Sequence, residues 1–130
     1  MKKIALEEHF SGPGFEKYLE AVAPEFDPDI LGSIEKFLPD FEQKRIAMMD
    51  RCGIDIAVLS QTAPGVQGER DTRIAVRAAR TCNDFLAEQI SKNPSRYRGF
   101  ACVALQDPNG AADKTATGEK ILSLLRDQLK

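Results

Sequence analysis

The sequence lacks the features of several protein classes. Its three cysteines, Cys52, Cys82 and Cys102, are dispersed without a CxxC pair, which argues against a disulfide framework and fits a reducing compartment. A net charge of −2 supplies no basic field, so we expect neither nucleic acid nor a membrane surface as a partner. No apolar run reaches the length of a membrane span, and the run after the two N-terminal lysines is too short for a signal peptide. We therefore expect a cytoplasmic protein.

The residues that are present form an ordinary globular composition, with 42% hydrophobic and 29% charged residues, enough for one domain across 1–130. Hydrophobic spacing and turn residues predict the following elements. They are a strand at 3–9, a short helix at 15–23, a loop rich in proline and aspartate at 24–39, a helix from Asp40 to Gly53, a strand at 54–59, a long helix from Asp71 to Asn93-Pro94, a strand at 99–105, and an amphipathic segment through Ile121, Leu125 and Leu129.

Three residues mark helix ends in this prediction. Asp40 with Gln43 has the spacing of a capping box, in which side chains satisfy the free amides of the first turn. Gly53 is suited to end that helix in the left-handed conformation, and Asp71 is suited to cap the long helix. Strands that alternate with helices at this spacing imply right-handed βαβ units, a parallel sheet and a ligand-binding edge at the carboxyl ends of the strands.

The strongest chemical candidate is Glu7-Glu8-His9, at the end of the first predicted strand. Side chains alternate along a strand, so Glu7 and His9 are expected on one face and Glu8 on the other. A carboxylate and an imidazole on one face can bind one divalent cation, and zinc or manganese suits this pair of ligands. A polar strand end with no bound metal is the alternative reading, because Glu-x-His is a common pattern.

Several sequence blocks, in one order, resemble the non-oxidative decarboxylases of the amidohydrolase superfamily that act on resorcylate and 2,3-dihydroxybenzoate-type acids, together with aminocarboxymuconate semialdehyde decarboxylase. The resemblance covers residues 3–10 and about 41–112, and 11–40 correspond loosely to a variable loop. The blocks are Lys3 to Phe10, Arg45 to Ile54, Leu59 to Gln67, Asn83 to Glu88, and Asn93 to Ala101 leading into Leu105 to Pro108.

The resemblance implies a (β/α)₈ barrel, of which this chain would supply about three βα units. It also implies one divalent metal ion, bound by Glu7 and His9, by a histidine from mid-chain and by a late aspartate that protonates the substrate ring. Ala63 and Pro64 would wall the pocket of a small aromatic carboxylic acid, although a turn chosen for its backbone geometry explains them equally well. A homo-oligomer is compatible with the resemblance.

The sequence carries only part of this site. His9 is its only histidine, and the resemblance stops after Ala112, which leaves a fragment, a truncated product and a misannotated reading frame as alternatives. One hypothesis is a decarboxylase completed by another chain. The other is a non-catalytic remnant or interaction module, and open sheet edges favour self-association and marginal stability. A Cys–His nucleophilic site is disfavoured, because all three cysteines are expected within helices or in mid-strand.

Overall fold

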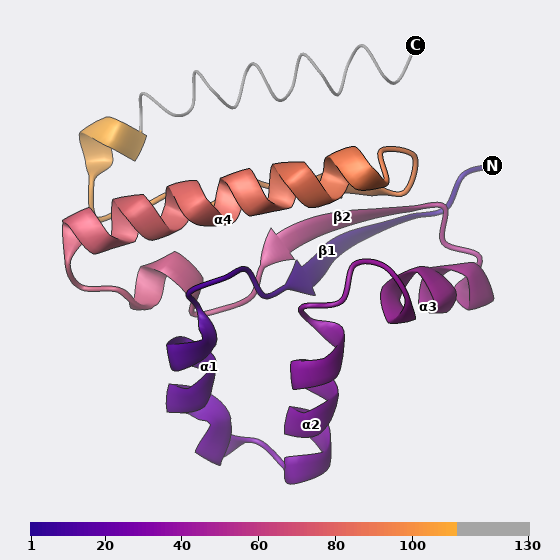
Figure 1. The fold of residues 1–130 in the computed structure, drawn as a ribbon, viewed down its shortest axis with the longest axis horizontal. Helices are drawn as coiled ribbons and strands as arrows, with labels where there is room; N and C mark the ends of the chain where they lie inside the picture. Colours follow the sequence, from indigo (N-terminus) through magenta and orange to yellow (C-terminus); the bar gives the residue numbers. More distant parts are fainter. Residues whose placement is uncertain (112–130) are drawn as a thin grey trace.

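The computed structural model describes residues 1–111 of the chain, so the predicted amphipathic segment at 121–129 lies outside the described residues. Figure 1 shows the order of the elements along the chain. The elements are β1 (Ile4–Phe10), α1 (Glu16–Val22), the 3₁₀ turn η1 (Ala23–Glu25), α2 (Pro28–Phe37), α3 (Lys44–Cys52), β2 (Ile56–Gln61), the 3₁₀ turn η2 (Gly65–Gly68), α4 (Thr72–Lys92) and β3 (Tyr97–Gly99).

The three strands form one parallel sheet in the order β1-β2-β3. His9 pairs with Ser60, and Leu59 pairs with Gly99. The carboxyl ends of β1 and β2 therefore lie side by side, as their arrowheads show in Figure 1. This arrangement confirms the predicted α/β fold with parallel strands in βα units. Within residues 1–111, no helix is both long and apolar enough to cross a membrane.

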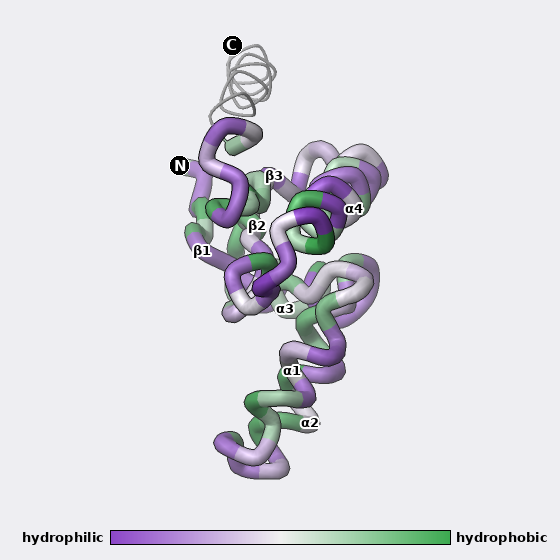
Figure 2. Tube along the Cα trace, turned by 90° about the vertical axis from the view of Figure 1, so that its left-hand side faces the viewer, coloured by the Kyte–Doolittle hydropathy of each residue, from purple (hydrophilic) through white to green (hydrophobic). Residues whose placement is uncertain are grey.

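The core lies between the sheet and α4, which runs beside the sheet in Figure 2. α4 buries residues at helical spacing, among them Ala75, Cys82 and Leu86, although the predicted core residue Ile74 is exposed. Tyr97 is fully buried, and its hydroxyl donates a hydrogen bond of 2.7 Å to the carbonyl oxygen of Phe41. This bond ties β3 to the segment that leads into α3.

The predicted loop at 24–39 is wrong, because α2 occupies Pro28–Phe37. Asp27 caps this helix by accepting a hydrogen bond of 2.9 Å from the backbone N–H of Asp29. Pro28 stands at the first helical position, where its missing N–H costs nothing and its fixed φ favours the helix. The Asp-Pro pair thus begins a helix instead of breaking one.

α1 and α2 extend away from the sheet (Figures 1 and 2), and neither η1 nor α2 contains a buried residue. The segment that carries α1 and α2 therefore forms an excursion from the sheet, and its two ends lie close together. The backbone N–H of Ser11 donates to the carbonyl oxygen of Leu38 across 3.1 Å. The excursion is therefore closed at its base.

The capping box predicted at Asp40 and Gln43 is wrong, because α3 begins at Lys44 and Gln43 forms no side-chain cap. Asp40 still satisfies a free amide of the first turn, since its Oδ1 accepts from the backbone N–H of Arg45 at 3.0 Å. The other two predicted helix ends are confirmed. Gly53 has a φ of 64°, and Asp71 accepts from the N–H groups of Arg73 and Ile74.

The third strand is present, but it ends at Gly99, and the predicted range 99–105 is wrong. One further ladder bond follows, from the N–H of Phe100 to the carbonyl of Leu59 at 2.8 Å. Beyond it, the side chain of Asn83 binds both backbone groups of Cys102, at 2.7 and 2.9 Å. The Asn83 side chain on α4 therefore forms hydrogen bonds with the backbone groups of Cys102. These groups are then not available to pair with a neighbouring strand.

Candidate metal and substrate site

Glu7, Glu8 and His9 lie at the carboxyl end of β1, as predicted, but the strand is not regular there. The pairing register shifts between Ala5 and Glu8, and Glu7 has a φ of 59°. Simple two-residue alternation therefore does not describe this segment. Glu7 is the only non-glycine residue with positive φ in the described part of the chain. Such backbone strain in other proteins concentrates at functional sites.

His9 is exposed, and the neighbouring strand holds one of its ring nitrogens. The Nδ1 atom lies 3.3 Å from the hydroxyl oxygen of Ser60, its register partner on β2. A metal-binding histidine ordinarily engages its second nitrogen in such a contact, which orients the ring and leaves the other nitrogen for the ion. Sequence reasoning included Ser60 only within a similar block, because its contact with His9 depends on strand register.

Arg45 fixes the backbone of the same strand end. Its Nη2 atom donates to the carbonyl oxygen of His9 at 2.7 Å and to that of Phe37 at 3.2 Å, and its Nε donates to that of Asp40 at 3.0 Å. Burial lowers the pKa of Arg45 from its ordinary value, against the opposing effect of nearby acidic groups. The guanidinium thus connects β1 to the α2–α3 connection. Sequence reasoning identified Arg45 only as the start of a similar block.

His9 borders two hollows. One, of about 390 Å³, is bordered by all three residues of the Glu7-Glu8-His9 motif, together with Arg45 and Met48. The other, of about 410 Å³, is lined by residues at the ends of β1 and β2 and by residues that follow β2 and β3. They include His9, Ser60, Ala63, Pro64, Phe100 and Cys102. The structure therefore brings the predicted pocket residues Ala63 and Pro64 to the hollow that His9 borders.

The donor set fits a metal ion only in part. Within residues 1–111, no group of three or more histidine, cysteine, aspartate or glutamate side chains is close enough to hold a metal ion. Glu7 and His9 would be two ligands of such a site. The rest would have to come from outside the described residues.

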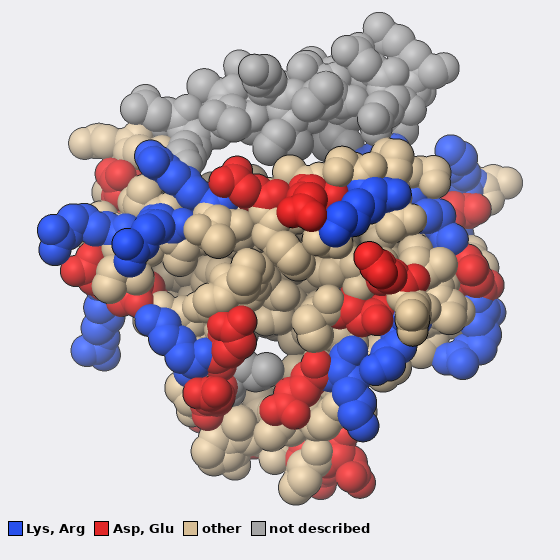
Figure 3. Space-filling view, viewed as in Figure 1, with Lys and Arg blue, Asp and Glu red and all other residues tan. Residues whose placement is uncertain are grey.

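Charge does not single out a binding face. On the face shown in Figure 3, basic and acidic side chains are interspersed. This pattern gives no field of one sign that would attract a polyanion.

The chain is an α/β protein with three parallel strands in βα units and polar residues at the carboxyl ends of β1 and β2, and it matches a fragment of the TIM-barrel structures of decarboxylases. No family model matches the sequence. Comparison with known proteins places the chain more narrowly. The chain is homologous to the N-terminal third of gamma-resorcylate and 5-carboxyvanillate decarboxylases, which are enzymes of the amidohydrolase superfamily.

Three relatives illustrate this homology. Gamma-resorcylate decarboxylase from a Polaromonas species is 43% identical over 110 residues, which are 85% of this chain and 33% of that protein. The structure of 2,6-dihydroxybenzoate decarboxylase with bound 2,6-dihydroxybenzoate has a TM-score of 0.79 and 38% identity, covering 88% of this chain and 35% of that one. The manganese-bound 5-carboxyvanillate decarboxylase of Novosphingobium aromaticivorans has a TM-score of 0.80 and 31% identity, covering 91% and 38%.

The chain therefore spans about a third of the length of the curated relatives that it matches.

Proposed function

We propose that this chain supplies the first two metal ligands, Glu7 and His9, and one pocket wall of a decarboxylase for hydroxybenzoate-type acids. The observation that carries the proposal is that His9 borders both hollows. One hollow is also bordered by Glu7, and the other by Ala63 and Pro64. A ligand in the second hollow would lie beside a cation held by Glu7 and His9.

The ion of this proposal is one divalent cation. A carboxylate and an imidazole suit both manganese and zinc. Manganese has the better support, because it is bound in the homologous 5-carboxyvanillate decarboxylase. When bound, the ion would supply Lewis acidity to the carboxylate and the adjacent phenolic oxygen of the substrate.

The residues of this chain would bind the metal ion and the aromatic substrate and orient them. The contact of Ser60 with Nδ1 would leave Nε2 of His9 for the ion, and Arg45 holds the backbone carbonyl of His9 in place. Ala63 and Pro64 form an apolar wall against the aromatic ring. The hollow of about 410 Å³ falls within the ordinary range of small-molecule sites, about 300–1,000 Å³.

The remaining ligands and the acid that protonates the ring would come from outside residues 1–111. An alternative function is a non-catalytic interaction module. It is favoured by exposed apolar side chains at the sheet and after it, of which Leu6 is 68% and Leu105 66% exposed. Both functions require a partner surface, and only the first requires a metal. The cytoplasmic location remains a prediction.

A chimera separates the two. Residues 1–111 of this chain replace the matching N-terminal third of the 2,6-dihydroxybenzoate decarboxylase. The chimera should bind one manganese ion per chain and release CO₂ from 2,6-dihydroxybenzoate. His9→Ala and Glu7→Gln should each weaken manganese binding by at least about 100-fold, since even partners outside the ligand set cost 10–100-fold.

Glu8→Gln is the matched control, because it removes the adjacent carboxylate and should leave manganese affinity within about threefold, far below the loss of a ligand. His9→Ala is expected to fold, since the His9 side chain is exposed. A folded chimera that keeps manganese affinity and CO₂ release after His9→Ala would refute the proposed role of His9. A folded chimera that never binds manganese would favour the interaction module.

A further inference from the structure

The fold brings together two cysteines that are far apart in sequence. Cys82 lies on α4, and Cys102 lies in the segment after β3. Their sulfur atoms are 3.6 Å apart. A disulfide bond is about 2.05 Å long, so the two sulfurs need to approach by only about 1.5 Å, within the reach of side-chain rotation.

The contact between the sulfurs is held in place by the backbone. Asn83, the residue after Cys82, accepts from the N–H of Cys102 at 2.7 Å and donates to its carbonyl at 2.9 Å. These two bonds fix the Cys102 segment against α4. The pair is therefore part of the folded structure, and an unfolded chain would not keep the two thiols together.

The two thiols have different surroundings. Cys82 is fully buried, and its thiol donates to the side-chain oxygen of Gln61 at 3.3 Å. Its hydrogen bond with Cys102 and its burial raise the pKa of Cys82. The contact with Cys82, together with a backbone N–H of Gln61, lowers the pKa of Cys102 against the effect of burial. Because the thiolate is the reactive form, Cys102 is the better nucleophile of the two.

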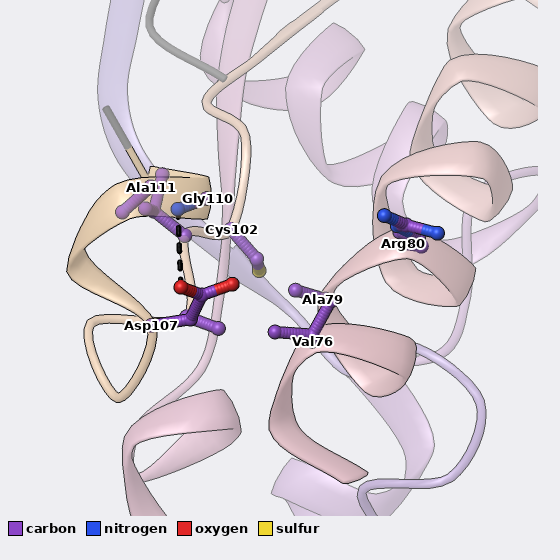
Figure 4. A pocket seen from close by; sticks show the side chains of 9 residues that line it. Val76, Ala79, Arg80, Cys102, Asp107, Gly110 and Ala111 are labelled. Atoms are coloured by element: carbon purple, nitrogen blue, oxygen red, sulfur yellow. Dashed lines mark hydrogen bonds between the residues drawn. The ribbon is translucent and has the colours of Figure 1, made fainter. Parts of the chain in front are cut away.

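A small molecule has room beside Cys102. A cavity of about 40 Å³ is lined by Cys102, by Val76 and Ala79 of α4, and by Asp107. Figure 4 shows the sulfur of Cys102 directed toward α4 at this cavity. A water molecule needs about 10–15 Å³ on this measure, so a molecule slightly larger than water fits. Cys102 also lines the larger hollow beside His9.

We propose that Cys82 and Cys102 form an oxidation site, at which hydrogen peroxide converts the thiol pair into an intrachain disulfide between α4 and the segment after β3. The thiolate of Cys102 attacks one peroxide oxygen, the O–O bond breaks, and the leaving hydroxide takes a proton to become water. Cys102 is then a sulfenic acid. The sulfur of Cys82 attacks the sulfur of Cys102, the S–O bond breaks, and the departing hydroxide leaves as water with the Cys82 proton. Two thiols are oxidised and one peroxide is reduced to two waters.

This site uses neither Glu7 nor His9, although Cys102 also lines the hollow proposed to hold the substrate. The third cysteine, Cys52, provides an internal comparison. It is exposed at the end of α3, and the nearest sulfur recorded for it is Sδ of Met48 at 4.0 Å. An exposed thiol with no thiol partner should remain free when the pair is oxidised.

The test treats the reduced full chain with one equivalent of hydrogen peroxide, then alkylates and maps the peptides by mass spectrometry. We expect one disulfide linking the peptides of Cys82 and Cys102, a fall in free thiols from three to one per chain, and full reversal by dithiothreitol. The same treatment in strong denaturant should not give this pairing preferentially. Cys52→Ser should leave the disulfide unchanged.

Cys82→Ala should stop the reaction at a sulfenic acid on Cys102, which dimedone traps. Because Cys82 is buried and its replacement can affect folding, the wild-type peptide map decides the question by itself. Preferential oxidation of Cys52, disulfide-linked dimers through Cys52, or oxidation of Cys102 beyond sulfenic acid without a link to Cys82 would each overturn the proposal.

Discussion

The buried hydroxyl of Tyr97 provides the sharpest stability test of this fold. Tyr97→Phe keeps the ring, which packs edge-on against Phe41 with ring centroids 5.9 Å apart, and removes only the donor to the Phe41 carbonyl. The carbonyl loses its partner in a place where water does not replace it. A buried group left without a partner costs about 1–3 kcal/mol, and we take about 2 kcal/mol.

Urea denaturation measures this loss. For a chain of this size the slope of unfolding free energy against urea is about 1–3 kcal/mol per molar. A slope of about 1.5 kcal/mol per molar converts the loss of about 2 kcal/mol into a midpoint shift of roughly 1.3 M. The slope itself should not change, because the substitution leaves the buried surface almost unaltered.

Ser33→Ala is the matched control, since it also removes a hydroxyl that donates to a carbonyl, that of Asp29 at 3.0 Å, but at an exposed site. Water can replace that bond, so the change should stay within about 0.5 kcal/mol. If Tyr97→Phe shifts the midpoint no more than Ser33→Ala does, the Tyr97 bond does not stabilise the core as described.

The same residue gives a dependence on alkaline pH. Burial raises the pKa of Tyr97 to about 12 from an ordinary value of 10.0. The folded state therefore holds this proton more tightly than the unfolded state does. The resulting stability is complete below pH 10 and is lost as the pH rises toward 12. The advantage of wild type over Tyr97→Phe should accordingly shrink above pH 10.

Two further predictions concern stability. A hydrogen bond from the hydroxyl of Tyr18, then one from the backbone of Asp71 and one from Lys17, hold the pKa of Glu69 at about 2, below its usual 4.5. Its contribution is present above pH 4.5 and is lost as the pH falls toward 2, so Glu69→Gln should flatten the acid side of the stability curve measured by circular dichroism. A Cβ at Gly99 would lie 2.5 Å from Cδ2 of Leu86, so Gly99→Ala should cost about 1–3 kcal/mol in urea. Gly32→Ala in α2, with open space at its Cβ, should instead stabilise by up to about 1 kcal/mol, and equal effects at the two glycines would contradict the described packing.

The correct parts of the sequence prediction rest on signals from residues that are close together in the sequence. Gly53 and Asp71 act within their own helix ends, and the apolar run at 54–59 marks a buried strand wherever its partners lie. Asp27-Pro28 is also a local signal, but the prediction of a loop treats proline as a helix breaker, whereas Pro28 stands in the first turn of α2. The extent of β3 was not local. It depends on Asn83, an α4 side chain that takes the backbone groups of Cys102.

Some features of the candidate site could likewise be predicted from neighbouring residues, and others could not. Glu7 and His9 could be proposed from one tripeptide, because their chemistry and their place on a strand are visible in the sequence. The bulge at Glu7 could not, because it arises from the register between β1 and β2. Ser60 and Arg45 reach His9 from positions 51 and 36 residues away, and the Cys82–Cys102 contact spans 20 residues. Contacts of this separation exist only after the chain has folded.

The closed base of the α1–α2 excursion has a consequence for protein engineering. The Ser11–Leu38 bond and the Arg45 guanidinium join the two ends of the excursion without passing through its tip. The outer part, from Ala23 to Lys36, contains no buried residue and lies before the Phe37 carbonyl that Arg45 binds. It is therefore a natural graft point, at which a shorter linker or a foreign helix could be installed while His9 keeps its position.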